Sequence, residues 1–257
     1  MTRPFGLEDL AGRRVLVTGA SSGIGAEVAL GFARCGARVA FHYRSGAARA
    51  EALRDAVIAG GGEAVTVGGD LANPVERDRV AEQAVARLGG LDILVNNAGV
   101  LVERRPVADS DDDFYDSIFD PNLRAVVGLT RALIPELKRQ GRASIINTSS
   151  RAAFTGGGNG SGLYAASKAA LNTLTISLAR ELGPFGIRVN TVAPGMIRTP
   201  IHDGTMDPAA VEAIATEVPL GRLGEPDDCV GAYLFLASER LAGYISGATI
   251  LVSGGRS

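Results

Sequence analysis

The chain has 257 residues, a net charge of −2 at pH 7 and both signs of charge interspersed along its length. This length allows a sizeable core, and the charge excludes the basic surface that nucleic acids and anionic membranes require. No run of about 18 uninterrupted apolar residues occurs, two cysteines are too few for a disulfide framework, and the two histidines lie far apart. We therefore expect a cytoplasmic protein with a small-molecule partner and no nucleic acid, membrane or metal.

Short apolar runs alternate with segments of helical period throughout the chain. Strands are predicted at 14–18, 38–43, 64–68, 91–96, 144–148, 188–192 and 249–252. Helices are predicted near 23–35, 47–59, 74–88, 111–140, 162–182 and 226–238. The alternation predicts one α/β domain over 1–257, Rossmann-like and doubly wound, with a mostly parallel seven-stranded sheet and helices on both faces. Ligands of such sheets bind outside the carboxyl ends of the strands.

Two segments depart from this regular pattern. The stretch from 194 to 210 has no clear period, and beside a ligand crevice it predicts a substrate lid, which we extend to 194–218. Pro121 falls inside the predicted helix 111–140, where it cannot donate to the carbonyl four residues back. We expect a kink at this proline.

A glycine-rich run, TGASSGIG at 18–25, joins the first predicted strand to the first helix. Gly19 permits a tight turn, Gly23 lets the backbone approach a pyrophosphate, and Gly25 allows close helix packing, while the helix N-terminus offers N–H groups. A plain turn is the alternative interpretation. The strand before and the helix after favour a phosphate cradle.

The end of the second predicted strand reads HYRS, with no acid for a ribose 2′-hydroxyl. Arg44 and Ser45 offer a cation and a hydroxyl to a 2′-phosphate, which favours NADP(H). With only these two groups we expect preference for NADPH rather than strict exclusion of NADH, and a solvent-facing Arg44 is the alternative. Asp70, after the third strand, either accepts a bond from an adenine amino group or holds a turn.

Tyr164 and Lys168 lie four residues apart at the start of the helix 162–182, so both lie on one face, one turn apart. The chain has only two lysines. A positive charge about 5 Å from a phenol lowers its pKa by roughly two units, toward neutrality. Such a phenol acts as an acid toward a carbonyl or as a base toward an alcohol. Ser149 and Ser150 follow the strand 144–148 and could donate to the same oxygen.

TGASSGIG, NNAG at 96–99, the paired serines, YAASK at 164–168 and APGMIRT at 193–199 together resemble the short-chain dehydrogenase/reductase family, in the family's order and over nearly the whole chain. The resemblance implies hydride transfer between NADP(H) and a carbonyl or secondary alcohol, in a homotetramer. It makes Tyr164 the general acid/base, Lys168 the ribose ligand that tunes it and Ser150 the group that orients the carbonyl. Asn122 would complete a water-linked proton relay.

The resemblance also extends the set of cofactor-binding positions. It assigns Asp70 to adenine, Ile197 and Thr199 to the carboxamide, and Arg44 to the 2′-phosphate. The full set of expected cofactor-binding residues is Gly19, Ser21, Ser22, Gly23, Ile24, Gly25, Arg44, Ser45, Asp70, Leu71, Asn96, Ala98, Gly99, Tyr164, Lys168, Pro194, Gly195, Ile197 and Thr199.

Several alternatives stay open at this point. The separation of Ser150 from Tyr164 is one residue longer than the family's commonest spacing, which leaves Ser149 as a second candidate for the active hydroxyl. Arg151 could meet an acidic substrate group or form a structural ion pair. A 3-oxoacyl-carrier-protein reductase is a narrower alternative, disfavoured by Phe185 where such enzymes tend to carry basic residues. A non-catalytic NADP(H)-binding sensor or scaffold is an alternative of another class.

Overall fold

The seven predicted strands form one sheet in which every neighbouring pair is parallel. The computed structural model describes residues 6–200 and 208–256. In chain order the strands are β1 (Arg14–Val17), β2 (Arg38–Tyr43), β3 (Glu63–Gly68), β4 (Ile93–Asn96), β5 (Ala143–Thr148), β6 (Ile187–Pro194) and β7 (Thr249–Val252). Their spatial order, β3-β2-β1-β4-β5-β6-β7, reverses direction between β1 and β4. Ligands of doubly wound sheets bind beside such a reversal.

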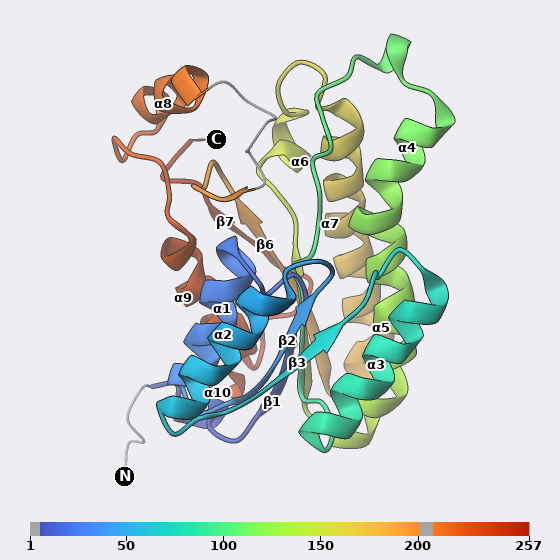
Figure 1. Cartoon of the computed structure of the whole chain (residues 1–257), viewed down its shortest axis with the longest axis vertical. Coiled ribbons are helices and arrows are strands. Elements are labelled where there is room, and N and C mark those ends of the chain that lie inside the picture. Colours follow the sequence, from blue (N-terminus) through green and yellow to red (C-terminus); the bar gives the residue numbers. More distant parts are fainter. Residues whose placement is uncertain (1–5, 201–207, 257) are drawn as a thin grey trace.

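Helices cover both faces of the sheet (Figure 1). One face carries α1 (Gly23–Arg34), α2 (Ala47–Ala59) and α9 (Pro226–Ala237), and the other carries α3 (Pro74–Leu88), α5 (Ala125–Gln140) and α7 (Gly162–Leu182). Four shorter helices are α4 (Asp112–Phe119), α6 (Ala152–Thr155), α8 (Pro208–Glu217) and α10 (Glu239–Ala242). Figure 1 shows α4, α6, α8 and the C-terminal end at one end of the molecule.

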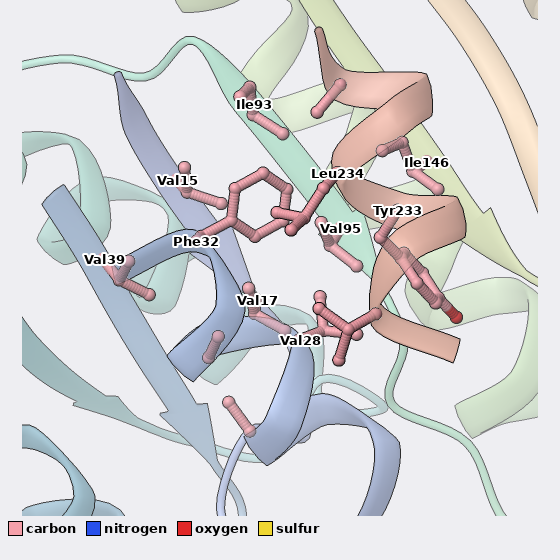
Figure 2. Close-up of a cluster of buried hydrophobic side chains, with 14 of the residues drawn as sticks. Val15, Val17, Val28, Phe32, Val39, Ile93, Val95, Ile146, Tyr233 and Leu234 are labelled. Atoms are coloured by element: carbon pink, nitrogen blue, oxygen red, sulfur yellow. The ribbon is translucent and has the colours of Figure 1, made fainter. Parts of the chain in front are cut away.

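The core consists of two apolar layers, one on each face of the sheet. In β1, Val15 and Val17 belong to the layer under α1 and α9, whereas Leu16 belongs to the layer under α3, α5 and α7. This alternation follows from the two-residue period of a strand. Figure 2 shows Phe32 of α1 and Leu234 of α9 packed over the valines of β1 and β4. Both faces are therefore sealed, and the ends of the strands remain for a ligand.

The structure shortens one predicted strand and divides one predicted helix. β4 begins at Ile93 because Leu91 and Asp92 form the turn before it: the Leu91 N–H donates to Glu136, and the Asp92 carboxylate accepts from Arg14 at 2.7 Å. The predicted helix 111–140 is divided into α4, a π-helical turn (Asp120–Arg124) and α5, because Pro121 lacks the N–H that regular helix bonding needs.

The predicted lid contains a helix that the sequence pattern did not reveal, α8. Residues 201–207 of the lid, with His202, lie outside the described residues. Cys35 and Cys229 are free thiols, as expected. Within the described ranges no helix is both long and apolar enough to cross a bilayer.

Candidate active site

A cleft of about 960 Å³ lies at the carboxyl ends of β1, β2, β4, β5 and β6. The glycine-rich run, the end of β2 and the YAASK segment all line it. Two irregular segments, 100–106 and 151–162, and the described part of the predicted lid also contribute residues to its walls. Segments far apart in the sequence thus meet in a single cavity.

The glycine-rich run forms a tight cradle between β1 and α1. Gly19 has a φ of +64°, and a Cβ there would lie 3.0 Å from the Cα of Ala98. A Cβ on Gly25 would collide with the backbone oxygen of Gly19. Within the described part of the chain, the Ser22 side chain does not cap α1, which leaves the first N–H groups of α1 available to an anion. Gly19 and Gly25 are therefore required by the close approach of chain segments, and Gly23 is favoured by its φ of +57°.

His42 supports this cradle, a role that sequence reasoning missed. The Gly19 N–H donates to His42 Nδ1 at 3.1 Å, so Nε2 carries the proton and donates to the Gly69 carbonyl at 3.0 Å. Burial lowers the pKa of His42 to about 4, opposed by the bond to Gly69 and the nearby Asp70 charge. A neutral imidazole therefore joins the ends of β1 and β3.

Polar groups gather where β2 meets α2. Arg44 and Ser45 line the cleft, and Arg49 in the first turn of α2 lines it as well. A Cβ on Gly46 would lie 2.7 Å from the Ser21 hydroxyl and 3.6 Å from the Nε of Arg49, so these groups lie close together. Sequence reasoning missed Arg49, although a basic residue one turn into the helix after β2 was a usable signal.

Asp70 serves a turn and lines the cleft at the same time. Its Oδ1 accepts from the Ala72 N–H at 2.9 Å, and its own N–H donates to Glu76 at 2.8 Å. Asp70 and the adjacent Leu71 both lie on the cleft wall. Both alternatives weighed from the sequence are therefore compatible with this geometry.

Tyr164, Lys168 and Ser150 line the same cleft, where β5 has ended and α7 begins. The Nζ of Lys168 lies 5.9 Å from the Tyr164 ring centroid and donates to the Thr148 carbonyl at 2.9 Å. Burial lowers the pKa of Lys168 to about 8, so the amine is predominantly charged at neutral pH. The pair meets on one helix face, as the spacing predicts.

The expected lowering of the Tyr164 pKa is not found. Desolvation of the phenol raises its pKa, and this outweighs the opposing effect of a hydrogen bond with Ser150. The expectation considered the charge of Lys168 but not the burial of both groups. Tyr164 is consequently protonated at neutral pH, the form that donates to a carbonyl oxygen.

The two serines at the end of β5 have different partners. The Ser149 hydroxyl is buried and donates to the backbone carbonyl of Lys168 at 2.9 Å. Ser150 forms the hydrogen bond with Tyr164, and its Oγ accepts from the Ala152 N–H at 3.1 Å. The hydroxyl of Ser150 is therefore the one paired with the phenol.

Asn122 lies behind the cleft wall rather than on it. Fully buried in the π-helical turn, it accepts from the Val100 N–H at 2.8 Å and donates to the Val100 carbonyl at 2.9 Å. A Cβ on Gly99 would lie 2.9 Å from its Oδ1 and 3.0 Å from the Nζ of Lys168. The absence of a side chain at Gly99 thus leaves room for both Asn122 and Lys168.

Asn96 does not reach the cleft. Its side chain is buried and donates to Asn147 at 2.9 Å and to Thr130 at 3.1 Å, which ties β4 to β5 and α5. The neighbouring Asn97 lines the cleft instead, and its Nδ2 donates to the Thr18 carbonyl at 2.9 Å. Because side chains alternate along a strand, the two asparagines of NNAG take different environments.

The remaining expected cofactor positions follow β6. Pro194, Gly195, Ile197 and Thr199 all line the cleft, and the Gly195 N–H donates to the Val252 carbonyl at 2.8 Å. Near them the lining includes Arg256, which no sequence motif indicated. Every expected cofactor residue except Asn96 therefore lies on the cleft wall.

This lining fits a nicotinamide dinucleotide. Three positions of the cradle lack side chains, and the first turn of α1 offers N–H donors of the kind that hold a pyrophosphate. Cationic and hydroxyl groups lie on the β2 side, and a charged amine lies beside Tyr164. One cleft thus combines donors for phosphates with an acid for a reacting oxygen.

The sequence matches a family model described as enoyl-(acyl carrier protein) reductase over residues 19–257. It is 40% identical to L-rhamnose 1-dehydrogenase (NAD(P)(+)) of Azotobacter vinelandii over 96% of this chain and 97% of the relative. Identity to the 3-oxoacyl-[acyl-carrier-protein] reductase of Staphylococcus aureus is 37%, covering 95% and 97% of the two chains. A Burkholderia cenocepacia short-chain dehydrogenase, solved with NADP, superposes with a TM-score of 0.88 at 37% identity, covering 96% and 99%.

These similarities extend over almost the entire length of the chain and of each relative. They agree with the all-parallel sheet and with the positions of the sequence motifs around the cleft. The chain therefore belongs to the short-chain dehydrogenase/reductase family, as an oxidoreductase that binds a nicotinamide cofactor.

Proposed function

We propose that the protein is an NADP(H)-dependent oxidoreductase that transfers a hydride between nicotinamide and a carbonyl or secondary alcohol carbon. The observation that carries this proposal is the convergence of Tyr164, Lys168 and Ser150 in the same cleft that the glycine cradle lines. A hydroxyl-paired phenol beside a charged amine suits proton transfer to an oxygen. This complete set of groups favours an enzyme over a non-catalytic sensor.

Each residue has a distinct role in this proposal. When bound, the nicotinamide supplies or accepts the hydride. Tyr164 donates the proton to the carbonyl oxygen during reduction, and Ser150 hydrogen-bonds to that oxygen. Lys168 holds a ribose hydroxyl and stabilises the phenolate left behind. Asn122, through its bonds to the Val100 backbone, fixes the part of the cleft wall next to Lys168. It also belongs to the water-linked relay that returns a proton to Tyr164.

The preference for NADP(H) rests on Arg44 with Ser45 and Arg49. A 2′-phosphate accepts charge-assisted bonds from guanidinium groups that a 2′-hydroxyl cannot match. The L-rhamnose dehydrogenase relative uses NAD(P)(+), and the Burkholderia relative was solved with NADP. Both arginines are exposed, so water competes for them and NADH remains usable.

Substituting Arg44 by alanine is expected to raise the dissociation constant for NADPH about tenfold, the loss of one exposed charge-assisted bond. Arg49→Ala should give a smaller effect of the same kind. Fluorescence titrations with NADPH and with NADH measure both constants directly. Arg54→Ala, further along α2, is the matched control.

The change in NADH affinity is the deciding comparison for Arg44. In Arg44→Ala the dissociation constant for NADH should stay within about twofold of the wild-type value, because the 2′-hydroxyl of NADH gains little from a guanidinium. An equal loss of affinity for both dinucleotides would show that Arg44 is an ordinary surface residue with no part in selecting NADPH. Faster turnover with NADH than with NADPH in the wild type would overturn the preference itself.

The proposal includes a homotetramer. Val127 of α5, Ile176 of α7 and Leu251 of β7 are 42%, 44% and 41% exposed in the single chain. Exposed large apolar side chains on helix faces and on an edge strand commonly form subunit contacts. Light scattering should give about four times the 26.5 kDa chain mass, and Ile176→Asp should lower it. A monomeric wild type would refute this assembly.

A further inference from the structure

One buried hydroxyl on the cleft wall has no hydrogen-bond partner among the residues that the structure describes. It belongs to Ser161, which is 4% exposed and lies directly before α7. Burial of a hydroxyl without a partner costs free energy, so such groups are uncommon in folded proteins. The place of Ser161 in the lining of the cleft points to a bound ligand as the partner.

The backbone of Ser161 is held on both sides, whereas its side chain is not. The Ser161 N–H donates to the Gly158 carbonyl at 2.9 Å, and the Ser161 carbonyl accepts from the Ala165 N–H at 2.9 Å. Serine directly before a helix commonly caps it, yet within the described chain this hydroxyl makes no cap bond to α7. The hydroxyl thus serves neither the helix nor the loop before it.

The glycine-rich loop before α7 leaves space at Ser161. Gly156, Gly157 and Gly160 have φ values of +77°, +75° and +73°. A Cβ on Gly157 would lie 3.0 Å from the Cβ of Ser161. Gly157 and Gly158 themselves line the cleft. The absence of a side chain at Gly157 therefore keeps the Ser161 side chain uncrowded.

Other polar side chains of the cleft lining have partners. The Thr155 hydroxyl accepts from the Gly157 N–H at 3.3 Å. Arg256, in a C-terminal turn that packs beside Val218 after α8, forms an ion pair with Glu217. Ser161 differs from these residues because its polar group is both buried and unpaired within the described chain.

Ser161 lies on the same face of α7 as the proposed catalytic pair. Ser161, Tyr164 and Lys168 are spaced by three and four residues, and all three line the cleft. Residues at these spacings are neighbours on one helix face, with Cβ atoms about 5–6 Å apart. A substrate that presents its carbonyl to Tyr164 can therefore reach Ser161 with a second oxygen a few bonds away.

We infer that the substrate is a hydroxy ketone or hydroxy aldehyde, and that Ser161 hydrogen-bonds the hydroxyl that takes no part in hydride transfer. The inference rests on the proposed function, whose substrate class it specifies. A serine hydroxyl both donates and accepts, and only a partner that also does both satisfies it fully. Because Ser161 is buried, an analogue without the second hydroxyl leaves it unpaired and is disfavoured.

Matched ketones test this inference. The probes are 1-hydroxy-2-butanone, 3-hydroxy-2-butanone and 4-hydroxy-2-butanone, each compared with its methyl ether at saturating NADPH. The ether keeps the electron-withdrawing oxygen but cannot donate a hydrogen bond. For at least one position of the hydroxyl, kcat/KM should favour the alcohol by about tenfold or more. In Ser161→Ala this advantage should fall to about twofold or less, with kcat/KM for the ether little changed. Ser161→Thr, which keeps a hydroxyl, should retain part of the advantage.

Thermal stability separates a binding hydroxyl from a structural one. Because the Ser161 hydroxyl has no partner within the described chain, its removal should not lower the Tm of the ligand-free protein. A Tm of Ser161→Ala more than about 3 °C below the wild-type value would assign the hydroxyl a structural bond and overturn the inference. Ser177→Ala, at an exposed serine of α7 away from the cleft lining, is the matched control and should change neither Tm nor the substrate preference.

Two kinetic results would also overturn the inference while the proposed reductase function stands. The first is equal use of alcohols and ethers by the wild type, as expected if Ser161 pairs only with water. The second is an equal loss of kcat/KM on both in Ser161→Ala.

Binding separates this inference from the proposed function. Calorimetric titration of the NADPH-saturated protein with 1,2-, 1,3- and 2,3-butanediol and with 2-butanol involves no turnover, because NADPH cannot accept a hydride from an alcohol. Tighter binding of a diol than of 2-butanol, lost in Ser161→Ala, would support the hydroxyl site even if no ketone is reduced. Equal binding of the diols and 2-butanol, together with reduction of ketones, would support the reductase and reject the hydroxyl site.

Discussion

Replacement of Tyr164 by phenylalanine is expected to lower the turnover number for ketone reduction by about 10²–10⁴-fold, the usual contribution of a positioned general acid. The ring and its packing in α7 are kept, and only the hydroxyl paired with Ser150 is lost. Since the buried phenol has a raised pKa, it is the proton donor at neutral pH. The measurement is kcat for NADPH oxidation with the best substrate from a panel of ketones, sugars and thioesters.

NADPH affinity supplies the internal control for this substitution. The dissociation constant should change by no more than about twofold, because in the proposed arrangement the cradle and the β2 side, and not the phenol, would hold the phosphates. Tyr115→Phe in α4, where the ring stacks on Phe119, is the matched tyrosine control and should retain full activity. Retained turnover in Tyr164→Phe would refute the assigned mechanism. A wild type that binds NADPH but reduces nothing would point to a sensor.

The free energy of unfolding is expected to fall by about 2 kcal/mol between pH 7.5 and pH 5 through His42 alone. Burial lowers the pKa of this histidine to about 4, against an ordinary value of 6.5. The folded pKa lies below the unfolded one, so the contribution is complete above pH 6.5 and is lost as the pH falls toward 4. Protonation would also place a hydrogen on Nδ1, where the Gly19 N–H now donates.

Urea unfolding at several pH values measures this dependence. In His42→Gln the amide cannot titrate, so the fall in unfolding free energy between pH 7.5 and pH 5 should largely vanish, although the variant starts less stable. Asp92, whose pKa is lowered by Arg14 against the effect of burial, loses its contribution only below this window. An unchanged pH dependence in His42→Gln would assign the effect to other groups.

Much of the fold could be predicted because its signals are local. Strands such as β2 and β5 are apolar runs bounded by turn residues, and the period of α7 extends over 21 residues. The helix 111–140 is divided because Pro121 lacks an N–H, and this proline can be read directly from the sequence. The helix α8 was missed because its alanine-rich segment follows a region without apolar period.

The residues of the candidate site could be predicted where their role depends on a fixed local spacing in the sequence. The cradle glycines and the Tyr164–Lys168 pair have fixed spacings, whereas His42 acts through bonds to backbone groups 23 and 27 residues away. Arg256 reaches the cleft only because the C-terminal turn packs beyond α8. The direction of the Tyr164 pKa depended on burial, which no spacing encodes. The features that the sequence did not predict are therefore those that depend on contacts between distant parts of the chain or on the desolvation of a buried group.

Because lysine is scarce in this chain, Lys168 in the cleft is one of only two side-chain amines that a labelling reagent can modify. The chain has two lysines, and Lys138 lies on the surface of α5 with its ammonium 3.5 Å from the centroid of the Phe185 ring. The other is Lys168, whose pKa of about 8 leaves a large fraction as free amine in mildly alkaline solution. A reagent that acylates or reductively alkylates side-chain amines thus meets one surface position and one position that a bound dinucleotide would shield. Comparison of lysine labelling with and without a dinucleotide would thereby report on Lys168, with Lys138 as the internal reference, without engineering the chain.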